Sequence, residues 1–242
     1  MKKLILFCLI LSACSSTKTF RKFTPEEGAA IKKYSKLINT KDGLYHVLIV
    51  TSMGDMVVKL YNETPLHRDN FISKVKAGFY DSLLFHRVIN NFMIQGGDPT
   101  SKHAKAGEAL GEGSAPGENI PAEFRTDQNI YHKRGVLAAA RDGNPEKSSS
   151  NCQFYIVQRK VWRPTQLDSA IVKRKLTLNE TQKKIYTTIG GTPHLDGGYT
   201  VYGELELGFE VLDKIATTKT GPADRPETDV RMKMFLLNEI KK

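Results

Sequence analysis

The stretch FHRVINNFMIQGGD, residues 85–98, is the part of this chain that decides the fold and the site. It places Arg87 five residues before the pair Phe92-Met93, and Gln95 two residues after that pair. Arginine keeps its charge at every working pH and offers a planar fork of donors, whereas glutamine offers a neutral amide. A cation and an amide beside large apolar side chains suit a ligand that is apolar, neutral and rich in amide groups, such as a proline-containing peptide.

The N-terminal residues have the pattern of an export signal. Lys2 and Lys3 precede an apolar run over residues 4–11, which is too short to span a bilayer stably. The run ends in Leu-Ser-Ala-Cys at Cys14, and small residues before a cysteine at this place resemble the bacterial lipobox. The resemblance implies a signal peptide over residues 1–13 and a lipid on the Cys14 sulfur. An ordinary signal peptide that happens to contain a cysteine is the alternative.

Residues 14–44 are interpreted as the lipidated cysteine, a tether and one short helix. Thr24-Pro25-Glu26-Glu27 offers an N-cap, a proline at the first helical position and a glutamate at the third, which is a capping-box pattern. Apolar residues then recur at helical spacing up to Ile38, and the helix either docks on the main domain or only spaces it from the lipid. The lipid anchor implies the bacterial cell envelope. No aspartate follows Cys14. By analogy with lipoprotein sorting in some bacteria, we therefore expect the outer membrane, with the domain facing the periplasm.

The charged residues are unevenly distributed. The formal net charge is +10, and residues 159–193 hold eight basic and two acidic residues, a net charge of +6 in one segment. Nucleic acid is a usual partner of such a patch, but we expect no nucleic acid for an exported protein. A solvated basic face is the plain interpretation, and recruitment of acidic stretches of a client protein is a further hypothesis. Only Cys152 remains after loss of Cys8 and lipidation of Cys14, so no intramolecular disulfide is expected.

Residues 45–242 predict one domain that is mostly β. Short β-branched or alternating runs, separated by turns and by a glycine-rich loop over residues 96–121, indicate a closed antiparallel β-barrel of about eight strands with flanking helices. The basic segment 159–193 interrupts this pattern and predicts a helical insertion, with Thr177-Leu178-Asn179-Glu180 as a second capping-box pattern. We expect a monomer.

Several other chemistries do not fit the sequence. The six histidines do not have the paired spacing of a metal site, and neither a Gly-x-Ser-x-Gly elbow nor a phosphate-binding glycine loop is present. We therefore expect no metal and no cofactor. Asp98 is interpreted as a residue that caps or turns the loop, and His86 as a packed structural histidine. His67 and His132 are interpreted as surface residues.

Further sequence blocks follow residues 85–98 in order, namely ENIPAEF (118–124), GVLAAA (135–140), SNCQFYI (150–156), and LDG (195–197) with YG (202–203). Together they resemble the cyclophilin family of peptidyl-prolyl cis-trans isomerases over residues 45–240, apart from the insertion. The resemblance implies a cyclophilin-like fold and rotation about X-Pro bonds in unfolded or exported polypeptides. A cyclophilin-shaped binding or chaperone module with little turnover is the alternative.

The resemblance also implies roles for individual residues. Arg87 would be the catalytic arginine, and Gln95 and Gln153 would hydrogen-bond the peptide backbone. The main chain at Ala140 and Arg141 would bind the residue before the proline. The other implied substrate-binding residues form the proline pocket and its edge: Phe92, Met93, Tyr155, His194, Leu195 and Tyr199.

The chain departs from the family's pattern at several of these positions. His194 stands where cyclosporin-sensitive members have tryptophan, so weak binding of that drug is expected. Tyr155 replaces a frequent phenylalanine, and its hydroxyl needs a partner or a water molecule. Tyr199 stands where many members have histidine, and Arg141 where asparagine is common. The single tryptophan, Trp162, lies in the insertion.

Overall fold

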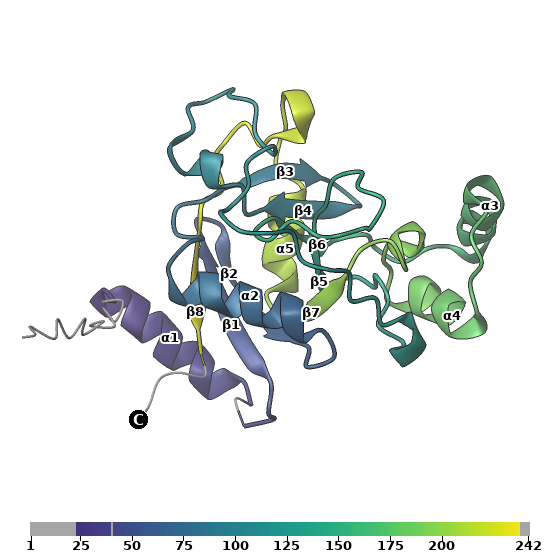
Figure 1. Cartoon of the computed structure of the whole chain (residues 1–242), viewed down its shortest axis with the longest axis horizontal. Coiled ribbons are helices and arrows are strands. Elements are labelled where there is room, and N and C mark those ends of the chain that lie inside the picture. Colours follow the sequence, from purple (N-terminus) through teal and green to yellow (C-terminus); the bar gives the residue numbers. More distant parts are fainter. Residues whose placement is uncertain (1–22, 40, 238–242) are drawn as a thin grey trace, which may run out of the picture.

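The chain folds around a curled sheet whose strands are short and separated by long loops (Figure 1). The computed structural model describes residues 23–39 and 41–237, so the predicted signal peptide and Cys14 lie outside the described residues. The strands are β1 (Tyr45–Thr51), β2 (Gly54–Leu60), β3 (Phe85–Ile89), β4 (Met93–Gly96), β5 (Val136–Ala139), β6 (Phe154–Val157), β7 (Val201–Leu207) and β8 (Met232–Leu236). The helices are α1 (Pro25–Leu37), α2 (Pro65–Lys76), α3 (Pro164–Arg174), α4 (Glu180–Thr188) and α5 (Phe209–Ala216). Short 3-10 helices occur at η1 (Pro99–His103), η2 (Thr126–Gln128), η3 (Pro193–Leu195) and η4 (Pro222–Asp224).

The eight strands pair in the order β3-β4-β6-β5-β7-β2-β1-β8, and every pairing is antiparallel. The sheet curls into a half-barrel, so the predicted closed barrel is wrong. Within the described residues, the edge strands β3 and β8 are not register partners. The chain just before β3 is joined to the start of β8 by an isolated bridge between Leu84 and Arg231 and by three main-chain hydrogen bonds, from the N–H groups of Phe85, Met232 and Ser82 to the carbonyls of Val230, Leu83 and Met232 at 3.0, 2.9 and 2.9 Å. A closed barrel needs a regular stagger of all its strands. Here β3 and β8 stand at the two ends of the strand order and do not pair, so the sheet stays open.

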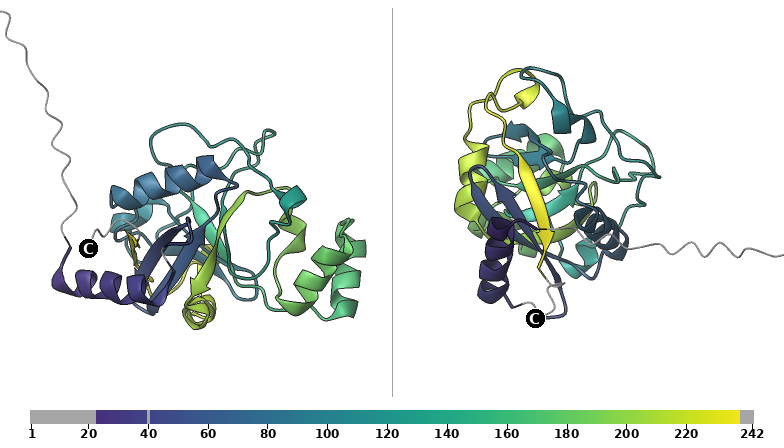
Figure 2. Two further views of the ribbon diagram at one scale, coloured as in Figure 1. Left: turned by 90° about the horizontal axis from the view of Figure 1, so that it is seen from below. Right: turned by 90° about the vertical axis from the view of Figure 1, so that its left-hand side faces the viewer.

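The main core fills the concave side of the sheet and is covered by two helices. In the view from below, α2 and α5 lie on opposite sides of the strands (Figure 2). Each helix has an apolar face because its apolar residues recur every three or four positions. These faces contribute Phe71, Ile72 and Val75 from α2 and Val211, Leu212 and Ile215 from α5 to one buried cluster. Full burial of a side chain of this size stabilises the fold by roughly 1.5–3 kcal/mol.

Helix α1 docks on the sheet. The predicted capping box is confirmed, because the Thr24 N–H donates to the Glu27 carboxylate at 3.0 Å and the Glu27 N–H donates to the Thr24 hydroxyl at 3.3 Å. Its apolar side packs Ile31 and Ile38 into a buried cluster with side chains of β1, β2 and β8. An ion pair of 2.7 Å joins Glu27 to Lys233 of β8. Of the two alternatives left open for this helix, docking is therefore the one observed.

The basic segment 159–193 contains helices α3 and α4, which lie at the end of the molecule away from α1 (Figures 1 and 2). Leu167 and Tyr186 of this segment form a small core with Tyr131 of the main domain, and Trp162 packs against it. The predicted helical structure of this segment is thus confirmed, but the capping residue of α4 differs. Asn179 caps α4 with Gln182 as the third residue, two positions later than the predicted pattern. In residues 23–39 and 41–237, no helix is both long and apolar enough to span a bilayer.

Candidate active site

The side chains of three neighbouring strands alternate between two apolar clusters. Ile94, Ile156 and Leu137 are register partners on β4, β6 and β5, and all three point into the main core. Successive residues of a strand point to opposite faces of the sheet. The next positions therefore face away from the main core, and among them Tyr155 and Ala138 belong to a second cluster. The sheet thus has a second apolar surface on its convex side.

This second cluster brings together the residues that the sequence assigned to the proline pocket. Met93, Tyr155 and Ala140 are buried in it, whereas three partly exposed side chains pack against them: Phe92, Leu195 and Tyr199. The buried members form an apolar base and the partly exposed members form its rim. His194 lies beside this rim, with its ring stacked on Phe92 at 5.8 Å between centroids and 21° between planes.

Arg87 lies in the same row of the sheet as this apolar surface. Arg87 pairs with Gln95 on β4, and Gln95 pairs with Tyr155 on β6. Adjacent strands are about 4.8 Å apart, so Arg87 starts about 10 Å from Tyr155 on the same face. Its side chain is 43% exposed, and its Nε lies 3.4 Å from a carboxylate oxygen of Asp224 on η4. The guanidinium therefore has one anionic partner, and part of it faces solvent.

The two glutamines do not have equivalent surroundings. The Gln153 amide donates to the carbonyls of Gly111 and Gly113 at 2.7 and 2.8 Å, and its oxygen accepts from the Gln95 amide at 3.1 Å. The Gln153 side chain is thus committed to the protein. The Gln95 amide oxygen has no hydrogen-bond partner within residues 23–39 and 41–237. Gln153 orients Gln95, and Gln95 is the glutamine with capacity left for a peptide.

The main chain at Ala140 is also partly committed. The Ala140 N–H donates to the Gln153 carbonyl at 3.0 Å, and the Ala140 carbonyl accepts from Ser150 N–H at 2.8 Å. The Arg141 side chain folds back, donating to the Gly198 carbonyl at 2.8 Å and lying 4.6 Å from the centre of the Tyr199 ring. Arg141 therefore holds Tyr199 at the rim. The second lone pair of the Ala140 carbonyl remains available to a bound peptide.

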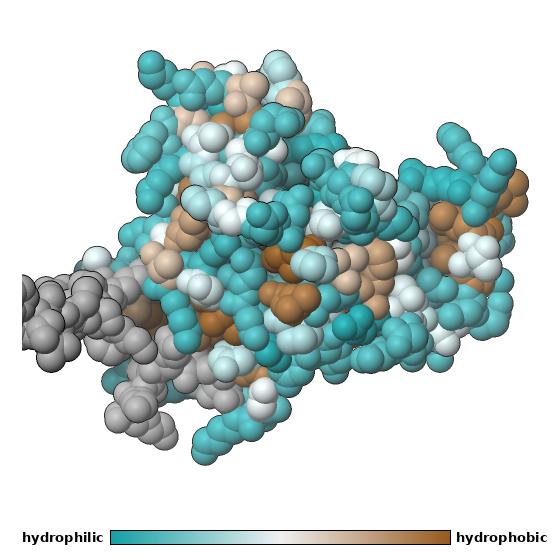
Figure 3. Space-filling model, in the orientation of Figure 1, coloured by the Kyte–Doolittle hydropathy of each residue, from teal (hydrophilic) through white to brown (hydrophobic). Residues whose placement is uncertain are grey.

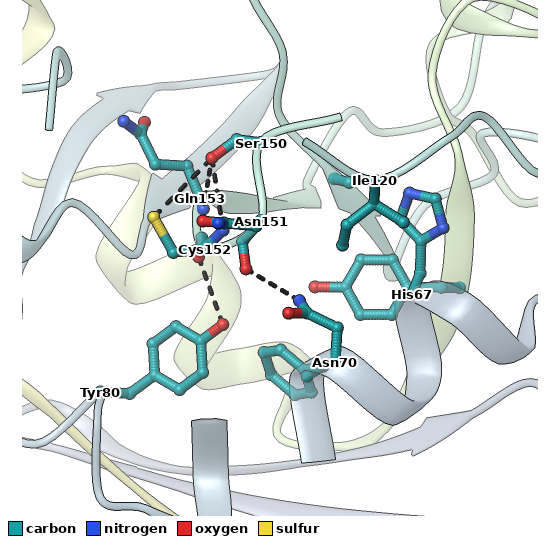
Figure 4. Close-up of a pocket in the computed structure, with 11 residues that line it drawn as sticks. His67, Asn70, Tyr80, Ile120, Ser150, Asn151, Cys152 and Gln153 are labelled. Carbon is teal, nitrogen blue, oxygen red and sulfur yellow. Dashed lines mark hydrogen bonds between the residues drawn. The ribbon is translucent and has the colours of Figure 1, made fainter. Parts of the chain in front are cut away.

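The segment that leads into β6 is fixed by helix α2 (Figure 4). The Asn70 amide donates to the Asn151 carbonyl at 2.8 Å, and the Tyr80 hydroxyl donates to the Cys152 carbonyl at 3.2 Å. The cavity drawn in Figure 4 has a volume of about 10 Å³, near the size of one water molecule, and lies behind Gln153. It is too small for a peptide. Cys152 is buried, as expected for a core thiol.

His67 is buried in this region, so its interpretation as a surface residue is wrong. One ring nitrogen lies 2.7 Å from the Glu123 carboxylate and the other lies 3.0 Å from the Ser149 hydroxyl. Burial lowers the pKa of His67, although the Glu123 carboxylate opposes that shift. The histidine was assigned to the surface because nothing local in the sequence indicates either partner.

A buried chain of hydrogen bonds joins the pocket to the insertion. The Tyr155 hydroxyl lies 3.0 Å from His132 Nε2, and His132 Nδ1 lies 3.0 Å from an oxygen of the Asp196 carboxylate. The other Asp196 oxygen accepts from Gln182 at 2.9 Å and from Tyr186 at 2.5 Å, both on α4. A carboxylate only accepts, so His132 donates from Nδ1 and Nε2 accepts from the tyrosine. His132 is therefore buried and not on the surface, and the partner needed by the Tyr155 hydroxyl is this histidine.

His86 and Asp98 have the structural positions that the sequence indicated. His86 is buried, and this burial lowers its pKa to about 4. The Asp98 carboxylate accepts from the N–H of Thr100 at 2.8 Å at the start of η1 and also from the N–H of Gly111. Asp98 thus caps η1 and fixes the long loop. Gly97, between this cap and β4, has φ +95° and no room for a Cβ against the Cys152 carbonyl, so only glycine fits there.

Trp162 does not line the second cluster, because it packs in the core of the insertion and donates to the Gly191 carbonyl at 2.8 Å. Sequence reasoning missed Asp224, Asp196 and His132 as neighbours of the site. The unpaired hydroxyl of Tyr155 was the available signal for His132, whereas Asp224 had none. In residues 23–39 and 41–237, no group of three or more His, Cys, Asp or Glu side chains is placed to hold a metal ion.

Comparison with known proteins identifies the family. The family described as "Cyclophilin type peptidyl-prolyl cis-trans isomerase/CLD" matches residues 46–235. A Staphylococcus aureus (strain COL) protein that carries the name of a peptidyl-prolyl cis-trans isomerase is 38% identical over 194 residues, covering 78% of this chain and 90% of the relative. A Streptococcus pyogenes protein named for a phosphatase and the same isomerase is 38% identical over 190 residues, and this match covers 76% of this chain but only 37% of that longer protein. The chain therefore belongs to the cyclophilin-type peptidyl-prolyl cis-trans isomerase family.

Solved structures agree on the fold. A cyclophilin type peptidyl-prolyl cis-trans isomerase of Cryptosporidium parvum superposes with a TM-score of 0.59 at 24% identity, covering 80% of this chain and 97% of that one. A structure of that protein in the presence of the dipeptide Ala-Pro gives a TM-score of 0.57 over 78% of this chain and 96% of that one. The predicted cyclophilin-like fold and the predicted isomerase activity of the family are both confirmed.

Proposed function

We propose that this isomerase rotates X-Pro bonds of exported polypeptides in the site between Arg87 and the second apolar cluster. The observation that supports this proposal is the row Arg87–Gln95–Tyr155 on one face of the sheet, beside Phe92 and Met93. In this proposal the proline ring lies on the apolar base, and the rim residues Leu195, Tyr199 and His194 enclose it. The Gln95 amide and the Ala140 carbonyl bind the peptide main chain. Gln153 and Arg141 act on the peptide through Gln95 and Tyr199, which they position.

Arg87 is the proposed catalytic residue because of the electronic change during rotation. The planar amide is stabilised by resonance, and rotation about the prolyl bond has a barrier of roughly 20 kcal/mol. In the twisted state the nitrogen regains a lone pair, so a fixed donor aimed at it binds the twisted state better than either planar state. Such differential binding lowers the barrier. The reaction transfers no proton and forms no covalent intermediate.

Replacement of Arg87 tests the proposal. We expect Arg87→Ala to lower kcat/KM about 100-fold or more in a protease-coupled assay with a proline tetrapeptide, the cost typical of losing one transition-state donor. Arg87→Lys is the matched control, since it keeps the charge but loses the planar fork, and we expect an intermediate rate. Both variants should keep the circular dichroism spectrum of the wild type, because the Arg87 side chain is 43% exposed.

The same assay separates the isomerase from the alternative of a binding module. A module with little turnover would bind the peptide without accelerating exchange, and its rate would not depend on Arg87. Equal rates for wild type and Arg87→Ala would therefore refute the role proposed for this residue.

We propose further that the protein is a lipid-anchored monomer of the bacterial envelope, facing the periplasm from the outer membrane. The support is the sequence pattern that ends at Cys14, with the polar residues that follow it. Such an anchor would place the active site among newly exported chains. Metabolic labelling with a fatty-acid analogue tests this, and label that persists in a Cys14→Ser variant would contradict it.

A further inference from the structure

Arg159 lies directly beside the pocket and has an unusual environment. Its N–H donates to the Phe92 carbonyl at 3.2 Å, which fixes it next to the rim of the second cluster. Its guanidinium lies flat over the Trp162 ring, 3.7 Å from the ring centre. Its Nε is buried and has no hydrogen-bond partner. The indole covers one face of the guanidinium, so its donors are held in a fixed plane.

The charge of a second guanidinium, that of Arg174, acts on Arg159. Arg174 is the last residue of α3 and is exposed. Burial first, and then the charge of Arg174, lower the pKa of Arg159. The same two causes, in the same order, lower the pKa of His194 to about 4. Arg159 and His194 thus both contact Phe92 at the edge of the pocket, and the charge of Arg174 acts on both of them.

Neither guanidinium has a carboxylate partner in the described part of the chain. Other partly buried arginines of this protein do: Arg134 pairs with Asp213 at 2.9 Å, and Arg225 pairs with Asp229 at 3.1 Å. Asp196, the carboxylate whose charge acts on His194, already accepts four hydrogen bonds, from His132, Gln182 and Tyr186. Two like charges that repel each other without a counter-ion cost free energy, and an anion between them removes that cost.

We propose that Arg159 and Arg174 form a subsite for the carboxylate of an aspartate or glutamate that flanks the proline on the His194 side of the pocket. This inference depends on the proposed function, because it places the peptide on the second cluster. The basic insertion would then select one class of substrate, namely peptides in which an acidic residue flanks the proline on one side. The guanidinium fork suits a carboxylate in two-point geometry.

The rest of the insertion strengthens this preference over a longer range. Of its eight basic residues, Lys183 and Lys160 have carboxylates within 2.8 and 3.9 Å. The other cations in the segment add a positive potential, which salt at 0.1 M screens over a distance of about 10 Å. An acidic flank would thus be attracted before it binds, and the preference should weaken as salt is added.

Paired peptides measure the subsite directly. Each pair consists of two proline peptides with the same sequence except for glutamate or glutamine at one position, so the two differ mainly in charge. That position is varied over the three residues on either side of the X-Pro pair. NMR exchange measurements give kcat/KM for each peptide without a protease. For the wild-type chain we expect glutamate to be favoured about threefold to tenfold at positions on one flank only, the range for a partly exposed charge pair. In Arg159→Gln/Arg174→Gln this ratio should fall to about one, while the rate for the glutamine peptides stays unchanged.

The matched control is Lys173→Gln/Lys184→Gln, which removes the same charge from residues 159–193 at two positions that do not contribute to the pKa shift of His194. We expect it to keep most of the preference. The inference is overturned if the wild type treats both peptides of every pair alike, or if the control lowers the ratio as much as the arginine pair does. Catalysis of the glutamine peptides in all of these variants tests the proposed function separately. Loss of the charge preference alone would leave that function intact.

Discussion

The hydrogen-bond chain between Tyr155 and helix α4 allows a quantitative test of how far the pocket depends on the insertion. The perturbation is Asp196→Asn. The carboxylate accepts four hydrogen bonds, from His132 N–H and Nδ1 and from Gln182 and Tyr186, and its side chain is 7% exposed. Asparagine keeps one acceptor oxygen and adds an amide donor, so at least two buried donors lose their acceptor. Each such loss costs about 1–3 kcal/mol, and we expect the free energy of unfolding to fall by about 2–6 kcal/mol.

The assay is urea unfolding followed by two signals. Trp162 is the chain's only tryptophan and packs in the core of the insertion, so its fluorescence reports on the insertion. Far-UV circular dichroism reports on the sheet and the remaining helices. Because Asp196 joins the two regions, both transitions should move to lower urea together. Asp168→Asn, an exposed aspartate on α3, is the control and should change the free energy by less than about 0.5 kcal/mol.

Two milder variants keep the test decisive if Asp196→Asn folds poorly. Tyr186→Phe removes one donor but leaves the carboxylate with three, so we expect a loss of about 0.5–1.5 kcal/mol. Tyr155→Phe leaves His132 Nε2 buried without a donor, so we expect a loss of about 1–3 kcal/mol with the apolar wall of the pocket retained. The reasoning is refuted if Asp196→Asn and Asp168→Asn have the same stability. It is also refuted if the Trp162 transition shifts while the circular dichroism transition does not.

Two further outcomes follow from charged groups near the site. Burial lowers the pKa of His86 to about 4, so between pH 6.5 and 4 the unfolded chain binds a proton that the native state does not. The contribution of His86 to the free energy of unfolding is complete above pH 6.5. As the pH falls toward 4, the free energy of unfolding decreases by roughly 3 kcal/mol through this group. Urea titrations at pH 7 and pH 4 should therefore show a smaller loss for His86→Gln than for the wild type, and equal losses would contradict this. Asp224→Asn should lower kcat about two- to fivefold, because Arg87 loses the carboxylate 3.4 Å from its Nε, with stability changed by less than about 0.5 kcal/mol. An unchanged kcat in the proline-peptide assay would show that Asp224 does not orient Arg87.

The sequence predicted the parts of the site that lie close together along the chain. Arg87, Met93 and Gln95 belong to one short hairpin, and the two-residue period of a strand is enough to place Met93 and Gln95 on the same face, with Arg87 opposite Gln95. Phe92 lies in the turn of this hairpin, directly before Met93. The structure adds the alternation that separates this face from the main core. The family blocks extended the prediction to Tyr155 and its neighbours, which no local pattern could have placed there.

Contacts between distant segments could not be predicted in this way. Asp224 is 137 residues from Arg87 in sequence, and nothing near it indicates a partner. His132 was assigned to the surface because an isolated histidine between polar residues gives no sign of burial. The cap of α4 was misplaced because two capping patterns overlap there by two residues, at Thr177 and at Asn179. Barrel closure depends on the register of every strand pair, which a sequence pattern does not contain.

The departures at Tyr155 and His194 have a common structural cause. A phenylalanine at position 155 would leave His132 without its donor, and His132 is the link between the pocket and the Asp196 carboxylate held by α4. His194 stacks on Phe92, to which Arg159 is hydrogen-bonded, and the charge of Arg174 acts on its ring. Both altered side chains therefore belong to the pocket and also interact with the insertion, Tyr155 through its hydroxyl and His194 through the charge of Arg174. In a chain with this insertion, residue 155 at the pocket base forms a hydrogen bond toward the insertion, and residue 194 at the pocket edge leaves room for the arginines of the insertion. The two substitutions and the insertion are thus parts of one arrangement, so replacing Tyr155 and His194 by the family's usual residues in the presence of α3 and α4 should cost stability and charge preference, respectively.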